Sequence, residues 1–135
     1  MNMIDAVKHV FTNYATFSGR ARRSEYWWFI LFNMIVTTLL SRIGKQVPME
    51  VAGQIVMVTQ SKLLSLYQLA AFLPGLAVTV RRLHDVGRSG WSYLWVLLPI
   101  IGWILLVVWL AREGQAGDNR FGLDPKAPAR APWEY

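Results

Sequence analysis

The uncharged apolar segment at residues 91–110 sets the strongest limit on what this protein can fold into. As an α-helix, its twenty residues would rise about 30 Å, which matches the hydrocarbon core of a bilayer. Trp91 and Trp109 stand at its two ends, where amphipathic rings favour a membrane interface. We expect this segment to cross a membrane, with a kink at Pro99 and Gly102.

Two further apolar segments, residues 26–43 and 63–80, fit the same environment. Eighteen helical residues rise about 27 Å, near the short end of what a bilayer requires. Arg23 and Arg42 bracket the first segment, where long basic side chains reach the headgroups. Pro74 predicts a kink in the second. The prediction is an all-α membrane protein in which residues 18–112 form about three transmembrane helices.

The composition agrees with a bilayer as solvent. The chain is 54% hydrophobic and 16% charged, whereas soluble domains carry about 25% charged residues. Its net charge of +6 arises from bases placed beside apolar segments, which favours contact with anionic lipid headgroups over nucleic acid. Cysteine is absent, which excludes disulfides and thiolate metal sites but leaves the redox compartment undetermined.

Three segments outside the predicted spans complete the domain organisation. Residues 1–17 have the spacing of an amphipathic helix, which either lies in the membrane interface or packs against its own protein. Residues 44–62 form either an interfacial turn or an early extension of the second helix. Residues 113–135 are polar and rich in Gly and Pro, which predicts a loosely ordered tail.

The first apolar segment and the flanking Lys and Arg residues both bear on the membrane topology. The first apolar segment lacks a small-residue cleavage site, so we expect it to be retained as a span rather than removed as a signal peptide. With the N-terminus inside and three spans, each side receives seven bases. The inside set clusters tightly beside the spans, which favours a cytoplasmic N-terminus and an external C-terminus.

Three motifs occur in order and are separated by the predicted spans: FSGRARRSEYWW at residues 17–28, RRLHDVGRSGW at 81–91 and GDNRFGLDP at 117–125. Together they resemble the bacterial domain-of-unknown-function 805 family, with Leu123 at a position where that family's motif would have Pro. The resemblance covers roughly residues 8–126. It implies a small inner-membrane protein and no agreed biochemical activity.

The polar residues of these motifs have two interpretations. In one, a structural network stitches the segments together through Glu25, His84, Asp85, Asp118, Asn119 and Arg120. In the other, surplus positive charge binds a phospholipid headgroup or an acidic partner segment, because the guanidinium fork bonds two phosphate oxygens at once. The candidate residues for this anion site are Arg20, Arg22, Arg23, Arg81, Arg82 and Arg88.

Catalysis is not expected. A triad of Ser89, His84 and Asp85 would need the acid on the far side of the imidazole from the nucleophile, which adjacent residues in one loop seldom achieve. The two histidines have no metal spacing, and no cofactor motif is present. We expect a non-enzymatic scaffold or adaptor that binds anionic lipid, a membrane-protein partner or its own copies. The alternative is a subunit of an oligomeric channel or small-solute transporter.

Overall fold

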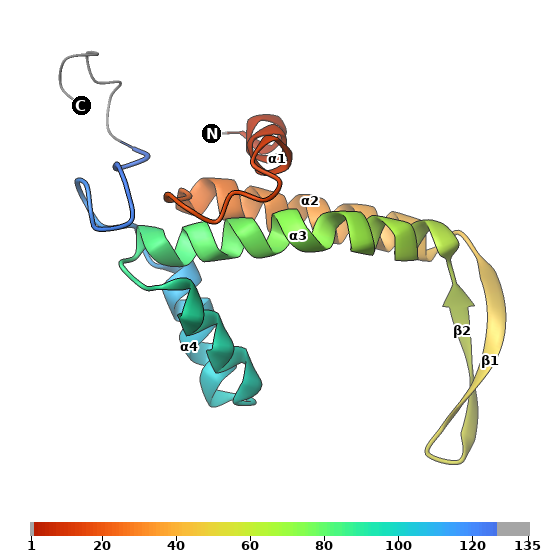
Figure 1. Cartoon of the computed structure of the whole chain (residues 1–135). Helices are drawn as coiled ribbons and strands as arrows, with labels where there is room; N and C mark the ends of the chain where they lie inside the picture. Colours follow the sequence, from red (N-terminus) through yellow and green to blue (C-terminus); the bar gives the residue numbers. More distant parts are fainter. Residues whose placement is uncertain (1, 127–135) are drawn as a thin grey trace.

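Two long antiparallel helices form the axis of the molecule (Figure 1). The computed structural model describes residues 2–126. In it, α2 (Arg23–Ser41) and α3 (Lys62–Asp85) lie side by side along most of their length. Ser61 caps α3 by accepting a hydrogen bond from the Leu64 amide at 3.2 Å. Pro74 lies inside α3, as the sequence indicated.

One helix among the described residues, α3, is both long and apolar enough to cross a membrane by those criteria alone. It has 24 residues, whereas α2 has 19 and begins with charged Arg23 and Glu25. The predicted number of three spans is therefore not confirmed.

The N-terminal helix α1 (Met3–Thr12) packs across the α2–α3 pair. The Asn2 side chain caps it by accepting a hydrogen bond from the Asp5 amide at 2.8 Å. Ala6 and Val10 are buried, and the Phe11 ring meets Phe29 of α2 edge to face, with 6.0 Å between centroids. The sequence left two placements of this helix open, and in the structure α1 packs against the rest of the protein.

A β-hairpin joins α2 to α3 and corrects the all-α prediction. Its strands, β1 (Lys45–Val51) and β2 (Gln54–Gln60), pair antiparallel from Lys45↔Gln60 to Val51↔Gln54. Ala52 and Gly53 form the two-residue turn with φ of 52° and 79°, the left-handed geometry that suits the twist of a hairpin. The strands are rich in β-branched Val, Ile and Thr, which favour extended backbone.

The segment expected to be the third span is not one helix. It divides into the 3₁₀ helix η1 (Gly90–Leu97) and α4 (Ile101–Ala111), and the two pack against each other. Leu98 is extended before Pro99, as the proline ring demands, and Ile100 takes a positive φ of 68°. The chain therefore reverses here. An 11-residue helix rises about 16 Å, which is too short for a bilayer core.

Close backbone contact holds this η1–α4 hairpin together. A Cβ atom on Gly102 would lie 1.7 Å from the Trp95 carbonyl oxygen, so only glycine permits the observed approach. The Trp103 indole N–H donates to the Val96 carbonyl at 2.8 Å, and the Trp95 and Trp109 rings meet edge to face.

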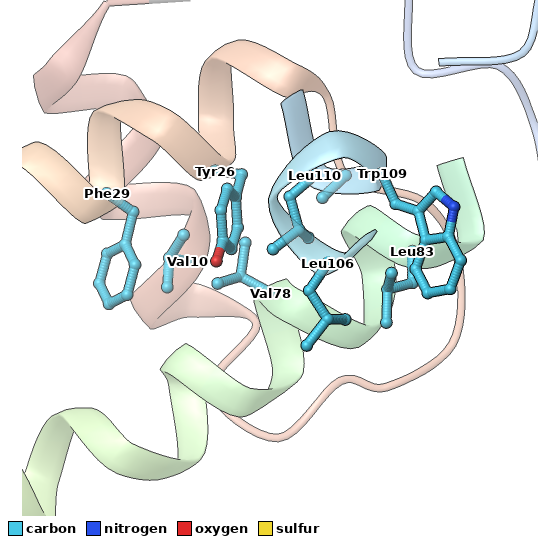
Figure 2. Close-up of a cluster of buried hydrophobic side chains, with 9 residues drawn as sticks. Val10, Tyr26, Phe29, Val78, Leu83, Leu106, Trp109 and Leu110 are labelled. Carbon is cyan, nitrogen blue, oxygen red and sulfur yellow. The ribbon is translucent and has the colours of Figure 1, made fainter. Parts of the chain in front are cut away.

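The buried core lies at the end of the α2–α3 pair where α1 and α4 meet it (Figure 2). Figure 2 shows side chains from all four helices in this cluster: Val10, Tyr26, Phe29, Val78, Leu83, Leu106, Trp109 and Leu110. Towards the hairpin end, α2 and α3 instead expose large apolar side chains; Leu39 is 61% exposed and Leu69 is 74% exposed. An apolar exterior over two paired helices is what a bilayer requires.

Candidate functional site

Asp85, in the last turn of α3, lies at the centre of a buried polar cluster. Its side chain is almost fully buried, and its two carboxylate oxygens accept from different arginines. The Arg20 Nε donates to Oδ1 at 3.0 Å, and the Arg82 Nη1 donates to Oδ2 at 2.5 Å. Both arginine side chains have no exposed area. A buried carboxylate needs such charge-assisted partners to offset its desolvation.

Arg20 also connects the N-terminal segment to the C-terminal segment. Its Nη1 donates to the Gly117 carbonyl at 2.5 Å, and its Nη2 donates to the Gln115 carbonyl. The Gln115 amide in turn donates to the Asp85 carbonyl at 2.8 Å. Gly114 packs so closely that an added Cβ would lie 2.0 Å from the Asp85 carboxylate. These contacts tie residues 114–117 to the end of α3.

Arg82 joins the end of α4 to the same cluster. Its Nε donates to the Leu110 carbonyl at 3.0 Å, and its Nη2 donates to the Arg112 carbonyl. These carbonyls belong to the last residues of α4 and its C-cap, which have no partner further along the helix. A cation at a helix C-terminus is also favoured by the helix dipole. Arg82 therefore caps α4 while it pairs with Asp85.

Glu25, in the first turn of α2, forms a second buried pair beside the first. Its Oε1 accepts from Arg81 Nη1 at 3.1 Å and lies 2.5 Å from His9 Nδ1 of α1. Glu25 and Arg81 are 1% and 2% exposed. The Arg81 backbone carbonyl also accepts from the Ala21 amide at 3.0 Å. These contacts fix α1 and α2 against the end of α3.

Four buried side-chain atoms near this pair have no hydrogen-bond partner among the described residues. They are Arg22 Nε, Ser24 Oγ, Arg81 Nε and Arg81 Nη2. Arg81 therefore uses one of its nitrogens in the internal network and leaves two without an acceptor in residues 2–126.

The third motif docks onto His84. The His84 ring bonds the Gly19 carbonyl at 2.9 Å and stacks on Phe121 with 4.1 Å between centroids. The Asn119 side-chain amide donates to the His84 carbonyl at 2.8 Å. Arg120 lies over the Phe121 ring, 4.5 Å from its centroid. Asp118 and Asp124 close the loop, since Asp118 Oδ1 accepts from the Asp124 amide at 2.9 Å.

Asp124 orders the chain on both sides of this loop. Its carboxylate accepts from the Lys126 and Gly117 amides at 2.9 and 2.8 Å. These two hydrogen bonds lower the pKa of Asp124 from its usual value because they favour the ionised form. These contacts fall within residues 113–126 of the expected loose tail, and residues 127–135 of that prediction lie outside the described residues.

The structure divides the arginines that the sequence offered as an anion site. Arg20, Arg81 and Arg82 are buried and paired with carboxylates, so they belong to the internal network instead of an open face. Arg23 and Arg88 are exposed, and Arg22 is half-buried. Arg88 lies over the Trp109 ring at 4.1 Å.

The proposed structural residues gather in one region, and several of their partners were not predicted. Glu25, His84, Asp85 and Asn119 belong to the three motifs and connect them through the hydrogen bonds described above. The sequence did not indicate His9 or the carbonyls of Leu110, Arg112 and Gln115 as partners. Backbone carbonyls have no signature in a sequence. His9 had one signal in the sequence. It lies three residues after Ala6 and therefore on the same face of α1.

The catalytic alternative has no geometric support in the described part of the chain. The Asp85 carboxylate is bonded to two arginines, and the His84 ring is bonded to the Gly19 carbonyl and stacked on Phe121. Ser89 makes no side-chain hydrogen bond there to either residue. Residues 2–126 contain no group of three or more His, Cys, Asp or Glu side chains that could hold a metal.

Comparisons with known proteins agree with the three-motif pattern. The model of the family described as "Protein of unknown function (DUF805)" matches residues 14–123. The chain is 45% identical to inner membrane protein YhaH of Escherichia coli K12 over 87% of this chain and 93% of that protein. It is 47% identical to inner membrane protein YhaI of the same strain, covering 87% and 92% of the two chains. No solved structure matches.

Proposed function

The chain belongs to the DUF805 family of proteins of unknown function, and we propose that it is a multi-pass inner-membrane protein that acts as a non-enzymatic scaffold or adaptor. Its exposed arginines would bind anionic lipid headgroups or an acidic segment of a membrane-protein partner. The names of the inner membrane proteins YhaH and YhaI support the membrane location. The apolar exterior of α2 and α3 supports the same placement.

The convergence of the three motifs on Asp85 is the observation that carries this proposal. Their charged groups hold one another, so the polar residues that resemble catalytic groups are already engaged. The network fixes α1, the ends of α3 and α4, and residues 114–124 as one platform. A rigid platform with its reactive groups engaged suits binding better than chemistry.

Exposed arginines outside the buried ion pairs lie at the same end of the molecule. Arg23, Arg88, Arg112 and Arg120 are exposed. Arg23 Nη1 reaches the Ala111 carbonyl at 3.4 Å, so residues from α2 and α4 meet here. Their planar forks suit phosphate and carboxylate oxygens, and the negative surface of a cytoplasmic leaflet attracts such clusters.

The same contacts support a cytoplasmic location for this end. Because Arg20 touches Gln115 and Gly117, the C-terminal segment lies beside the N-terminal one, on one side of the membrane that α2 and α3 would cross. Arg112, Arg120 and Lys126 then join the N-terminal set, which rises from seven bases to ten. The β-hairpin side keeps Arg42, Lys45 and Lys62. The excess follows the positive-inside rule.

Native mass spectrometry tests the lipid-binding face. The triple variant Arg23→Gln, Arg88→Gln, Arg112→Gln removes three positive charges from the platform. The matched control Arg42→Gln, Lys45→Gln, Lys62→Gln removes three charges from the opposite end. After exchange into nanodiscs of phosphatidylglycerol and phosphatidylcholine, the platform variant should retain several-fold less phosphatidylglycerol than the control. Equal retention by the two variants would reject the proposed face.

The alternative of an oligomeric channel or small-solute transporter rests on a polar groove between α2 and α3. Asn33, Thr37, Thr38 and Gln68 line it, within helices that otherwise expose apolar side chains. A closed ring of four or more subunits in the same mass spectra, together with conductance in liposomes, would favour this alternative over the scaffold.

A further inference from the structure

The groove between α2 and α3 is a polar feature on an apolar surface. It has a volume of about 520 Å³ and is lined by Asn33, Met34, Thr37, Thr38, Gln68, Ala71 and Phe72. Asn33 is near the middle of α2, and Gln68 is two turns into α3. Around them, Met34 is 62% exposed and Phe72 is 69% exposed. The groove therefore opens where the proposed membrane placement puts hydrocarbon.

The groove contains two side-chain amides, those of Asn33 and Gln68. The Tyr67 hydroxyl donates to Asn33 Oδ1 at 2.7 Å. Gln68 is exposed and its side-chain amide has no hydrogen-bond partner among residues 2–126. An amide left without a partner in hydrocarbon is costly, because no water is present to bond it. A lipid acyl chain has no donor or acceptor to offer it.

We propose that a second copy of this chain covers the groove, with Gln68 of each copy bonded to Gln68 of the other. This inference rests on the proposed membrane placement of α2 and α3. Copies inserted with the same orientation are related by a two-fold axis along the membrane normal, so a given residue meets its equivalent at the same depth. A carboxamide has both a donor and an acceptor, so two equivalent amides satisfy each other. Interhelical contacts of this type are a general means of association in membranes.

The neighbouring side chains suit the same arrangement. Thr37 and Ala71 are small and permit close approach of two helix pairs, whereas Met34 and Phe72 supply apolar contact at the rim. The β-hairpin and the arginine platform lie at opposite ends of α2 and α3 (Figure 1). A dimer through the groove would therefore present two platforms side by side on the same side of the membrane.

Single-cysteine cross-linking tests the dimer directly, since the chain contains no cysteine. The groove variants are Thr37→Cys and Gln68→Cys. The matched controls are Ile35→Cys and Leu66→Cys, which are two residues away on the far side of each helix and are 44% and 64% exposed. In native membranes treated with copper–phenanthroline, at least one groove variant should give disulfide-linked dimer at five times the control level or more. A disulfide requires Cα atoms within about 7 Å. No dimer from either groove variant, or equal dimer from all four, would overturn the proposal.

A second measurement separates this proposal from the proposed function. Gln68→Leu should weaken dimerisation in native mass spectra by about threefold to tenfold, while Gln68→Asn keeps part of it because it keeps both hydrogen-bonding groups. Alkaline carbonate extraction reports whether the protein is integral to the membrane. If the protein resists extraction but is monomeric, or forms rings of four or more, the dimer is overturned and the membrane placement stands. A protein released by carbonate overturns both.

Discussion

At the residue scale, Asp85 does more than neutralise charge. It accepts from Arg20, which holds the C-terminal segment, and from Arg82, which caps α4. Each arginine is positioned by backbone carbonyls as well as by the carboxylate. Loss of Asp85 would leave two buried guanidinium groups without their counter-charge. A buried ion pair is weak evidence for stability, but removal of one partner is strongly destabilising.

We predict that Asp85→Ala lowers the free energy of unfolding by about 3–5 kcal/mol, because it leaves buried positive charge uncompensated. The control is Glu113→Ala. Glu113 pairs with Lys126 at 3.3 Å, but its side chain is 72% exposed, so its loss should cost less than about 1 kcal/mol. Thermal unfolding in detergent measures both variants. An Asp85→Ala melting temperature equal to that of Glu113→Ala would show that the cluster contributes little.

At the element scale, the η1–α4 hairpin is the feature that local sequence patterns misrepresent. Hydropathy alone makes residues 91–110 the best span in the chain, and a straight helix would satisfy that pattern. The reversal instead depends on Ile100 adopting a positive φ and on contact between Gly102 and the Trp95 carbonyl. The β-hairpin was missed for a similar reason: a short apolar stretch does not distinguish a strand from a helix extension.

Gly102→Ala should separate η1 from α4, since its Cβ would meet a backbone oxygen that cannot rotate away. Overpacking of this kind costs about 1–3 kcal/mol, and tryptophan fluorescence should change because Trp95 and Trp109 lose their ring contact. Gly75→Ala in α3 serves as the control, because its nearest neighbour would be the Phe29 ring at 3.7 Å. If both variants unfold at the same temperature with the same spectra, the hairpin is not packed in this way.

At the scale of the whole molecule, the internal contacts decide which ends share a side. The three-span prediction separated the N- and C-terminal segments across the membrane, whereas the structure joins them through Arg20, Gln115 and Gly117. The β-hairpin projects from the other end of α2 and α3 (Figure 1). An isolated two-stranded hairpin is only marginally stable in water. Apolar residues of this hairpin, such as Ile55 and Met57, are exposed.

Cysteine labelling with a membrane-impermeant maleimide should report this topology. We expect Ser18→Cys and Ala116→Cys to react from the same side, and Met57→Cys to react from the opposite side. Intact spheroplasts and inverted vesicles provide the two directions of access. If Ala116→Cys instead reacts together with Met57→Cys, residues 91–110 cross the membrane as the sequence pattern suggested.

The sequence by itself determined the apolar environment, the positions of α1, α2 and α3, and the three motifs that mark the family. These depend on hydropathy and helical periodicity, which are local properties of the chain. The tertiary structure decided which arginines are buried, where the C-terminal segment lies and that residues 91–110 turn back. Those outcomes depend on contacts such as that of Arg20 with Asp85, 65 residues apart, and on backbone carbonyls that no sequence pattern marks.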